Sequence, residues 1–455
     1  MEAKQESLGC NLYTTAVRFQ EPMVILGQWN TTVSVLERNT MQKYIFPLAL
    51  LMTLSCGSLV AQEWPQFRGP HGNGHAATSL QTNWSEKEAV TWKAELPGKG
   101  WSSPVISGDF IWMTTAVQNK EGPVDLHALC VSLKSGKLIH NIKLFEQSKP
   151  EKIHAMNSYA SPTPVIAGNR VFCHFGNYGT ACLDVKSGAV QWKINRFYYQ
   201  TQNGPGASLV AWKGLLFFNC DGVDQQYAVA IQQETGATVW KVNRSGKLRD
   251  NPEMKKSYCT PSIVKTKTGD LLISPSADWV YAYEPTSGKE VWKANYGQLG
   301  FSCVPKPIFR EETAYILTSF SPSRLLAIDF NGKGDVTESN VQWTFGSNMP
   351  SKPSLVIVDE NLYAISDKGI LSCLDASTGK QKYKQRIGGS FAASPLYAGG
   401  NIYLFDTDGK TTIFEPGDSY KPVKTNQLDG EFMASPAVAG KSLILRTDKA
   451  LYRID

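Results

Sequence analysis

One pattern of hydrophobic and polar positions recurs along most of the chain. A start built on small residues, Ser or Thr and often Pro precedes a β-branched strand, an aromatic strand follows, and an apolar strand then ends in Asp-x-x-Thr/Ser-Gly-x-x-x-Trp. The pattern appears about eight times at intervals of roughly 47 residues, a spacing typical of four-stranded propeller blades. It therefore predicts an all-β chain that forms an eight-bladed β-propeller.

The start of each repeat and the turn that ends its third strand can be located. The starts are at Ser103-Pro104, Thr163-Pro164, Ala207-Ser208, Thr260-Pro261, Val304-Pro305, Lys352-Pro353, Ser394-Pro395 and Ser435-Pro436. The turns end at Gly136, Gly188, Gly236, Gly288 and Gly379, and the last four are followed by Trp192, Trp240, Trp292 and Tyr383. Asp can cap such a turn and Gly accepts its positive φ, so we expect the aromatic rings to pack between neighbouring blades.

The two ends of the repeat region complement each other. The final repeat stops after the strand Leu451–Ile454 and lacks a fourth strand, whereas Ala89–Ala94 has the Trp-Lys ending of the other outer strands. Pairing the two segments would remove exposed sheet edges. We therefore predict that this N-terminal strand completes the last blade and that residues 62–455 form a single propeller of four-stranded blades.

The segment before the repeats has the features of an export signal. Lys43 precedes the apolar run Tyr44–Leu54, which at about 11 residues is shorter than the roughly 20 needed to cross a bilayer. We predict a signal peptide at residues 41–61 and interpret residues 1–40 as a non-native or disordered leader. Lipidation of Cys56 is not favoured, because the residues before it form a poor lipobox.

Charge and cysteine content exclude some functions. The formal net charge is +6 and no basic block is interleaved with aromatic residues, so nucleic acid is not an expected partner. The mature part has no stretch typical of a membrane span.

The seven cysteines of the mature part have no zinc-site spacing. A two-residue turn at Asn177-Tyr178 would place Cys173 opposite Cys182, as a cross-strand disulfide or as two small buried residues.

Two polar segments are candidates for binding. The insertion Lys149–Tyr159 lies between the first two repeats, and such insertions map to one face of a propeller. Its side chains His154, Asn157 and Tyr159 either bind a polar ligand together or anchor a long loop. Asp221 and Asp224 form a second, comparable polar turn.

A third segment is a candidate for metal binding. Asp329, Asn331 and Asp335 look like the first part of an EF-hand loop, where oxygen ligands at alternating positions hold Ca²⁺. Lys333 occupies one of the ligand positions, and Asn340 stands where a bidentate Glu is needed. We therefore favour a capped turn over a calcium site here.

Together these repeats resemble the bacterial proteins with pyrroloquinoline-quinone-like propeller repeats, and the resemblance extends from Trp64 to Asp455. That superfamily contains quinoprotein alcohol dehydrogenases and also non-catalytic scaffolds similar to BamB, so the resemblance implies a fold rather than an activity. The opening segment Trp64–Gly74 looks like a signature of a secreted subgroup. We expect its Trp64 and Phe67 to pack at the rim of the ring.

The resemblance implies a specific test for an enzyme. Quinoprotein dehydrogenases hold the quinone between a Trp and a disulfide of adjacent cysteines, beside Ca²⁺ and an Asp base, and this chain has no adjacent cysteines. Trp279 or Trp101 could stack on the quinone and Asp278 or Asp221 could act as the base, but roles within the repeats explain these residues equally well.

We therefore predict an exported, monomeric, non-catalytic protein that binds or scaffolds a protein, peptide or polysaccharide partner. Its expected location is the periplasm or the extracellular space, with association with the outer membrane left open. No cofactor is expected. The alternative hypothesis is an oxidoreductase that depends on pyrroloquinoline quinone (PQQ) or on a metal such as calcium.

Overall fold

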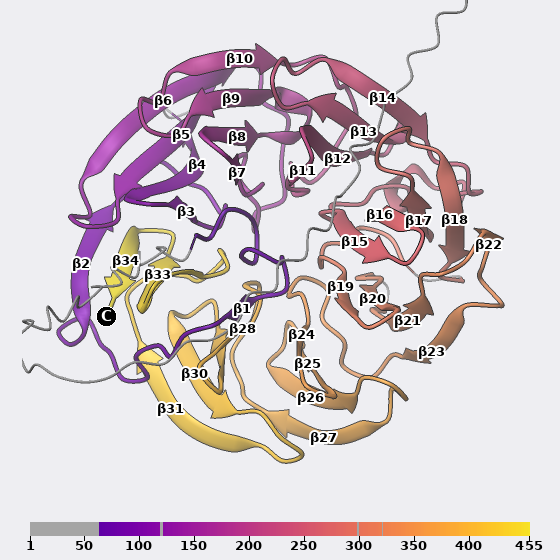
Figure 1. Cartoon of the computed structure of the whole chain (residues 1–455). Coiled ribbons are helices and arrows are strands. Elements are labelled where there is room, and N and C mark those ends of the chain that lie inside the picture. The colour runs from indigo at the N-terminus through magenta and orange to yellow at the C-terminus, as the bar shows by residue number, and fades with distance from the viewer. Residues whose placement is uncertain (1–62, 119–121, 298–299, 321) are drawn as a thin grey trace, which may run out of the picture. The chain divides into compact units, whose positions relative to one another are not determined.

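The computed structural model describes residues 63–118, 122–297, 300–320 and 322–455, which form eight β-sheets arranged as the blades of a propeller (Figure 1). The predicted leader at residues 1–40 and the signal peptide at 41–61 lie outside the described residues. Two short 3₁₀ turns, η1 (Gly176–Tyr178) and η2 (Pro252–Met254), interrupt the β-structure. Within the described ranges, no helix has the length and apolar character needed to cross a bilayer.

The blades follow one another along the chain. Blade 1 contains β3 (Val105–Ser107), β4 (Phe110–Gln118), β5 (Val124–Ser132) and β6 (Leu138–Gln147). Blade 2 contains β7 (Val165–Ala167), β8 (Arg170–His174), β9 (Thr180–Asp184) and β10 (Val190–Ile194). Blade 3 contains β11 (Val210–Trp212), β12 (Leu215–Asp221), β13 (Gln226–Gln232) and β14 (Thr238–Asn243). Blade 4 contains β15 (Ser262–Thr266), β16 (Gly269–Pro275), β17 (Trp279–Tyr283), β18 (Glu290–Asn295) and the short β22 (Gly334–Asp335).

The second half repeats this plan. Blade 5 contains β19 (Ile308–Arg310), β20 (Thr313–Leu317), β21 (Leu325–Asp329) and β23 (Val341–Phe345). Blade 6 contains β24 (Val356–Val358), β25 (Asn361–Ile365), β26 (Ile370–Asp375) and β27 (Gln381–Arg386). Blade 7 contains β28 (Leu396–Ala398), β29 (Asn401–Phe405), β30 (Lys410–Glu415), β31 (Lys421–Gln427) and the short β1 (His75–Ala76). Blade 8 contains β32 (Ala437–Ala439), β33 (Ser442–Arg446), β34 (Ala450–Ile454) and β2 (Val90–Glu95).

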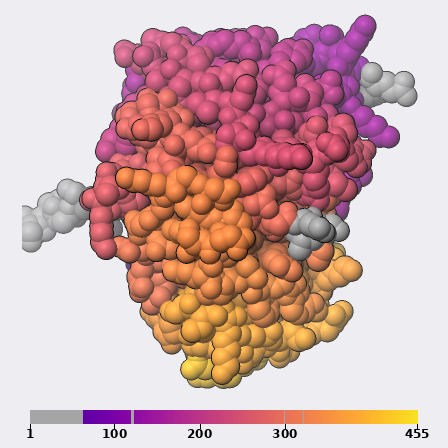
Figure 2. Space-filling model, turned by 90° about the vertical axis from the view of Figure 1, so that its right-hand side faces the viewer, coloured from indigo at the N-terminus to yellow at the C-terminus, as the bar shows by residue number. Residues whose placement is uncertain are grey.

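Burial along each blade follows from its position between two neighbours. The middle strands are buried on both faces, as in β8 and β25, because adjacent blades cover them. Outer strands such as β2 alternate between partly buried and exposed positions. Figure 2 shows this outer rim from one side, with the colour passing from magenta through orange to yellow as successive blades follow the chain.

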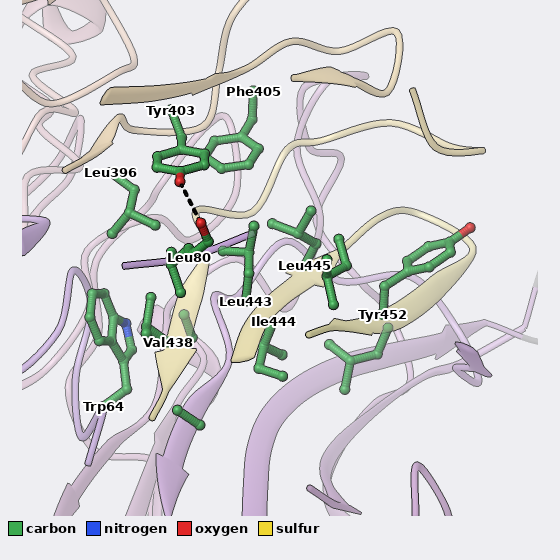
Figure 3. Packing of buried hydrophobic residues seen from close by; sticks show 14 of the residues in the cluster. Trp64, Leu80, Leu396, Tyr403, Phe405, Val438, Leu443, Ile444, Leu445 and Tyr452 are labelled. Atoms are coloured by element: carbon green, nitrogen blue, oxygen red, sulfur yellow. Dashed lines mark hydrogen bonds between the residues drawn. The ribbon is translucent and has the colours of Figure 1, made fainter. Parts of the chain in front are cut away.

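The predicted closure of the ring is confirmed. Strand β2 pairs antiparallel with β34, so that Lys93 lies opposite Tyr452 and Ala94 opposite Leu451. The segment before β2 adds a second closure, since Trp64 and Leu80 pack with hydrophobic residues of blades 7 and 8 (Figure 3). The Tyr403 hydroxyl donates a hydrogen bond to the Leu80 carbonyl (3.4 Å). The two ends of the described chain therefore hold the last blades together.

Tryptophans of the outer strands lock each blade to the next. The indole Nε1 donates to a carbonyl in the turn after the third strand of the following blade, in the pairs Trp92–Leu133 (2.9 Å), Trp192–Gln233 (3.0 Å), Trp240–Pro285 (2.9 Å), Trp292–Phe330 (2.8 Å) and Trp343–Ser377 (3.0 Å). The predicted turn chemistry is present beside these rings. Asp375 Oδ1, for example, accepts hydrogen bonds from Ser377 N and from Thr378 N and Oγ1. In blade 1, His140 takes the place of the tryptophan and lies 2.9 Å from the Lys186 carbonyl.

A ring of hydroxyl groups joins the inner ends of the blades. A backbone N–H donates to the Ser or Thr hydroxyl of the next blade in the pairs Ser103–Thr163, Thr163–Ser208, Ser208–Thr260, Lys306–Ser354, Ser354–Ser394, Ser394–Ser435 and Ser435–Ser103, at 2.9–3.1 Å. We call these eight positions the hydroxyl ring. Lys306 is its one member without a hydroxyl, so Thr260 N–H has no hydroxyl in the next blade to which it could donate.

The hydroxyl ring corrects two predicted repeat starts. The equivalent positions in blades 5 and 6 are Lys306-Pro307 and Ser354-Leu355, two residues after the predicted Val304-Pro305 and Lys352-Pro353. Both earlier sites contain a Pro that imitates the repeat start in sequence, whereas the hydrogen bonds identify the later residues.

The tryptophan lock can be tested at Trp240, which is 8% exposed. Trp240→Ala removes a buried ring and its hydrogen bond, so we expect a loss of about 3–5 kcal/mol in the free energy of unfolding. Denaturant unfolding measures this loss. Tyr198→Ala is the control, because Tyr198 is 72% exposed and should change stability by less than about 0.5 kcal/mol. Equal effects in the two variants would contradict the lock.

Candidate functional site

The described residues form a cavity of about 440 Å³ at one end of the central channel. Residues that precede the inner strands of all eight blades line it: Ser103, Thr163, Ser208, Thr260, Val304, Ser354, Ser394 and Ser435. We call this end the channel mouth. Because the hydroxyl ring fixes all of these residues except Val304 relative to one another, the blades themselves form the cavity.

Aromatic and other apolar side chains form the wall of the channel mouth. Trp101, Tyr258 and Phe301 contribute rings, and Phe301 lies 6.2 Å from Phe320 between ring centroids. Phe320 and Met156 are 40% and 46% exposed, which is unusual for large apolar side chains. Exposed apolar residues that gather around a preformed cavity are typical of a binding site.

The opposite end of this cavity is closed by the N-terminal segment. Phe67 lines the same cavity. Two residues earlier, the Pro65 carbonyl accepts a hydrogen bond from Ile166 N of inner strand β7 (2.7 Å). Trp64 forms a bridge to Ile106 of β3, and the Gly74 carbonyl accepts from Tyr397 N of β28 (2.8 Å). The indigo segment in Figure 1 accordingly crosses the centre of the ring.

Two lysines give the channel mouth its charge. Lys256 lies 5.7 Å from the Phe301 ring centroid and donates to the Glu253 carbonyl, and burial lowers its pKa. Lys352 forms an ion pair with Asp367 (3.2 Å). No carboxylate among the described residues lines the cavity. The channel mouth is therefore apolar with a positive component.

Of the three predicted binding residues of the insertion, two line the channel mouth and one does not. His154 and Asn157 line the channel mouth, and Asn157 Nδ2 donates to the carbonyls of Asn203 (2.7 Å) and Pro205 (3.1 Å). Tyr159 lies away from the cavity lining, where its hydroxyl donates to the Glu151 carbonyl (2.6 Å). Asn157 and Tyr159 thus hold the loop in place, while His154 is exposed beside the opening.

The second predicted pair has structural contacts. Asp221 is fully buried and bonds Arg244 through two contacts, Nε to Oδ1 at 2.9 Å and Nη2 to Oδ2 at 2.8 Å. Desolvation opposes the charge of Arg244, yet the attraction of Asp221 leaves its pKa well above the ordinary value. Asp224 Oδ1 accepts from Gln200 N (2.7 Å) and so fixes a loop. Neither aspartate lines the channel mouth.

The EF-hand-like segment is occupied by turn contacts. Asp329 Oδ1 accepts from the backbone and side-chain nitrogens of Asn331 (2.8 and 3.1 Å), and Asp335 Oδ1 accepts from Thr337 N and Oγ1 (3.1 and 2.6 Å). The segment also adds β22 to blade 4. In the described part of the chain, no group of three or more His, Cys, Asp or Glu side chains is placed to hold a metal. These contacts are those of the capped turn that we favoured, and calcium binding stays a prediction.

The predicted pairing of Cys173 and Cys182 is wrong. Cys173 lies opposite Ala181 and Cys182 opposite Phe172, and both thiols are free and buried. The turn η1 changes the register by one residue relative to a two-residue hairpin, and the two side chains therefore join different hydrophobic clusters. They are small core residues.

The residues considered for a quinone site do not assemble around one. Trp101 lines the channel mouth, but Trp279 donates to the Lys247 carbonyl (3.0 Å) and Asp278 pairs with Arg249, both outside the cavity lining. With no carboxylate among the described lining residues and no adjacent cysteines in the sequence, the donor set does not fit a calcium-bound quinone.

Most of the channel mouth was not predicted from the sequence. Lys256, Phe301 and Met433 come from three different connections between blades, and Phe320 comes from the loop between β20 and β21 within blade 5. Their shared signal is position, since Lys256, Phe301 and Met433 each lie shortly before a repeat start. An alignment of the repeats with one another would have shown the apolar or basic residues at that position.

The buried pair Asp221–Arg244 gives a stability prediction. Asp221→Ala leaves the guanidinium buried without its partner, so we expect a loss of about 3–5 kcal/mol in the free energy of unfolding. The double variant Asp221→Leu with Arg244→Met removes both charges and should recover most of that loss. Denaturant unfolding of both variants provides the measurement, and an unchanged single variant would show that the pair is not structural.

Comparisons with known proteins agree with this architecture. The model of the family described as "Outer membrane protein assembly factor BamB" matches residues 74–217, 224–337 and 332–419. A search of curated proteins finds no match. Among solved structures, BamB from Moraxella catarrhalis is 14% identical, with 80% of this chain and 96% of that chain covered and a TM-score of 0.54.

Two solved enzymes share the fold. A europium-containing methanol dehydrogenase is 10% identical (86% of this chain, 90% of that chain, TM-score 0.64), and the quinohemoprotein alcohol dehydrogenase from Comamonas testosteroni is 11% identical (86%, 80%, TM-score 0.63). Such low identities show the fold alone. The family match, in contrast, extends over most of the sequence, and the chain belongs to the BamB family of PQQ-repeat β-propellers.

Proposed function

We propose that this chain is an exported, non-catalytic binding protein of the cell envelope that holds an apolar segment of a protein partner in its channel mouth. The observation that carries the proposal is the preformed cavity of about 440 Å³ with exposed Met156 and Phe320 at its wall. Export is supported by the predicted signal peptide at residues 41–61, and an envelope location by the family's description as an outer membrane protein assembly factor.

The chemistry of the wall favours a peptide over the other predicted partners. Aromatic residues and Met are enriched in protein interfaces, and flexible Met side chains adapt to different sequences. Lys256 and Lys352 favour an acidic group beside the apolar residue of the partner. A polysaccharide would need many paired hydroxyl contacts, whereas the ring hydroxyls Ser103, Thr163 and Ser208 each already accept a backbone N–H and keep only their own O–H to donate.

An oxidoreductase is the second candidate function. The fold shared with a methanol dehydrogenase and an alcohol dehydrogenase supports it. The lining of the channel mouth does not, because its described residues include no carboxylate that could serve as base or calcium ligand. We therefore place binding first.

Peptide selection tests the binding proposal. Random peptides displayed on phage are selected on the purified chain, and we expect those enriched to combine a large apolar residue with an acidic residue. Phe320→Asp and Met156→Asp introduce negative charge into the apolar wall and should each weaken binding about tenfold or more. Fluorescence anisotropy of labelled synthetic peptides measures the affinities.

Exposed apolar residues elsewhere supply the matched controls for this test. Val190→Asp and Val239→Asp change side chains that are 42% and 41% exposed on the outer strands β10 and β14, and they should keep wild-type affinity. Peptides that bind all four variants equally would place the site elsewhere.

A titration with PQQ, with and without Ca²⁺, tests the second candidate function. Saturable binding with alcohol-dependent dye reduction would replace the binding proposal with an oxidoreductase.

A further inference from the structure

A second cavity, of about 390 Å³, lies at the opposite end of the channel beneath the N-terminal segment. Its walls are residues 70–73 of that segment and the inner strands β11, β15 and β19 of blades 3, 4 and 5. Lys306 lines this cavity, and His71 is exposed at its edge. No Asp or Glu among the described residues contributes to the lining.

Lys306 is the exceptional member of the hydroxyl ring. The other seven positions hold Ser or Thr, and each of those hydroxyls accepts a backbone N–H. An ammonium group cannot accept, so the lysine costs the ring one hydrogen bond. Lys306 is 5% exposed and lines the cavity, and among the described residues no carboxylate forms an ion pair with its amine. Charging an amine in such a place is unfavourable unless an anion joins it.

Arg68 brings a second buried cation to the same region. The residue is 1% exposed, and its Nη2 donates to the Asn73 carbonyl (2.9 Å). Its Nε and Nη1 are buried without a hydrogen-bond partner in the described chain. Arg68 is close enough to Lys306 to lower the pKa of that amine by repulsion. Arg68 does not itself line the cavity, so its charge acts on Lys306 from behind the lining.

The N-terminal segment is shaped around both cations. A Cβ added at Gly72 would lie 2.2 Å from Lys306 Nζ, and one added at Gly74 would lie 2.5 Å from Arg68 Nη2. Both glycines also have positive φ (65° and 78°), which other residues rarely adopt. The segment therefore passes close to the lysine and the arginine, and its positive φ angles favour glycine at both positions.

We propose that this cavity is a binding site for an oxyanion, a sulfate, phosphate or carboxylate group, held by Lys306, with the positive charge of Arg68 acting from behind the lining. An anion would accept a hydrogen bond from the Lys306 amine and offset the repulsion between the two cations. The site lies on the far side of Phe67 from the channel mouth and is independent of the proposed peptide binding.

The ionisation of Lys306 gives the site a measurable signature. Burial, with a smaller contribution from Arg68, lowers the pKa of Lys306 to about 7, while the buried Cys259 acts in the opposite direction. At pH 8 the free amine is therefore mostly neutral. Binding of an anion favours the charged form, so each binding event takes up about one proton and the affinity falls as pH rises above about 7.

Isothermal titration calorimetry of the purified chain with sulfate, at pH 8 in two buffers of different ionisation enthalpy, tests the proposal. Sulfate does not titrate in this range, so an uptake of about one proton reports on the protein. Acetate and inorganic phosphate are titrated in parallel to identify which oxyanion is preferred. Chloride at matched ionic strength controls for screening.

Lys306→Ser is the decisive variant, because it installs the residue type of the other ring positions. It should supply the missing acceptor for Thr260 N–H and raise the midpoint of thermal unfolding, while sulfate affinity falls about tenfold or more and proton uptake disappears. Lys193→Met is the control and should keep wild-type sulfate affinity, since Lys193 is an exposed lysine of the outer strand β10 that lines neither cavity. Sulfate binding that persists in Lys306→Ser, or wild-type protein that binds none of the three oxyanions, would overturn the proposal.

Discussion

The hydroxyl ring is the interaction on which the geometry of this propeller depends. Each blade contributes one residue, and in seven of the eight steps its N–H reaches the hydroxyl of the next, so the position of nearly every inner strand is set by its neighbours. The last link, from Ser435 to Ser103, joins blade 8 back to blade 1 across 332 residues. Because seven residues of the hydroxyl ring also line the channel mouth, the shape of this cavity and the closure of the ring have one structural origin.

Local chemistry explains why much of the fold could be predicted from the sequence. The turn that ends the third strand needs Asp and Gly within five residues, and the tryptophan follows four residues later, so a short phrase identifies each lock. The hydroxyl ring is not local. Its partners are 40 to 60 residues apart except at the closure, and the prolines at 305 and 353 imitate the repeat start two residues too early.

The surroundings of the candidate site residues could not be predicted for the same physical reason, because they depend on contacts and strand register that the sequence does not show. Asp221 looks like a surface ligand in a polar turn until Arg244, 23 residues away, is placed against it. Cys173 and Cys182 would pair across a two-residue turn, but η1 changes the register, and a shift of one residue reverses the face of the sheet. The insertion at 149–159 lies at the channel mouth, and its place on one face of the ring could be predicted because its position between two blades, unlike its contacts, is visible in the sequence.

The two ends of the channel differ in a way that composition alone does not reveal. At the mouth, apolar rings are exposed beside lysines that already have partners, an arrangement suited to a flexible apolar chain. At the other end, Arg68 is buried with two donors unused, and Lys306 lines a cavity to which no described carboxylate contributes. The opening segment Trp64–Gly74 thus does more than cap the ring, because its Phe67 lines one cavity while its residues 70–73 line the other. A change in that segment is therefore expected to act on both cavities, whereas a change at Lys306 acts on one.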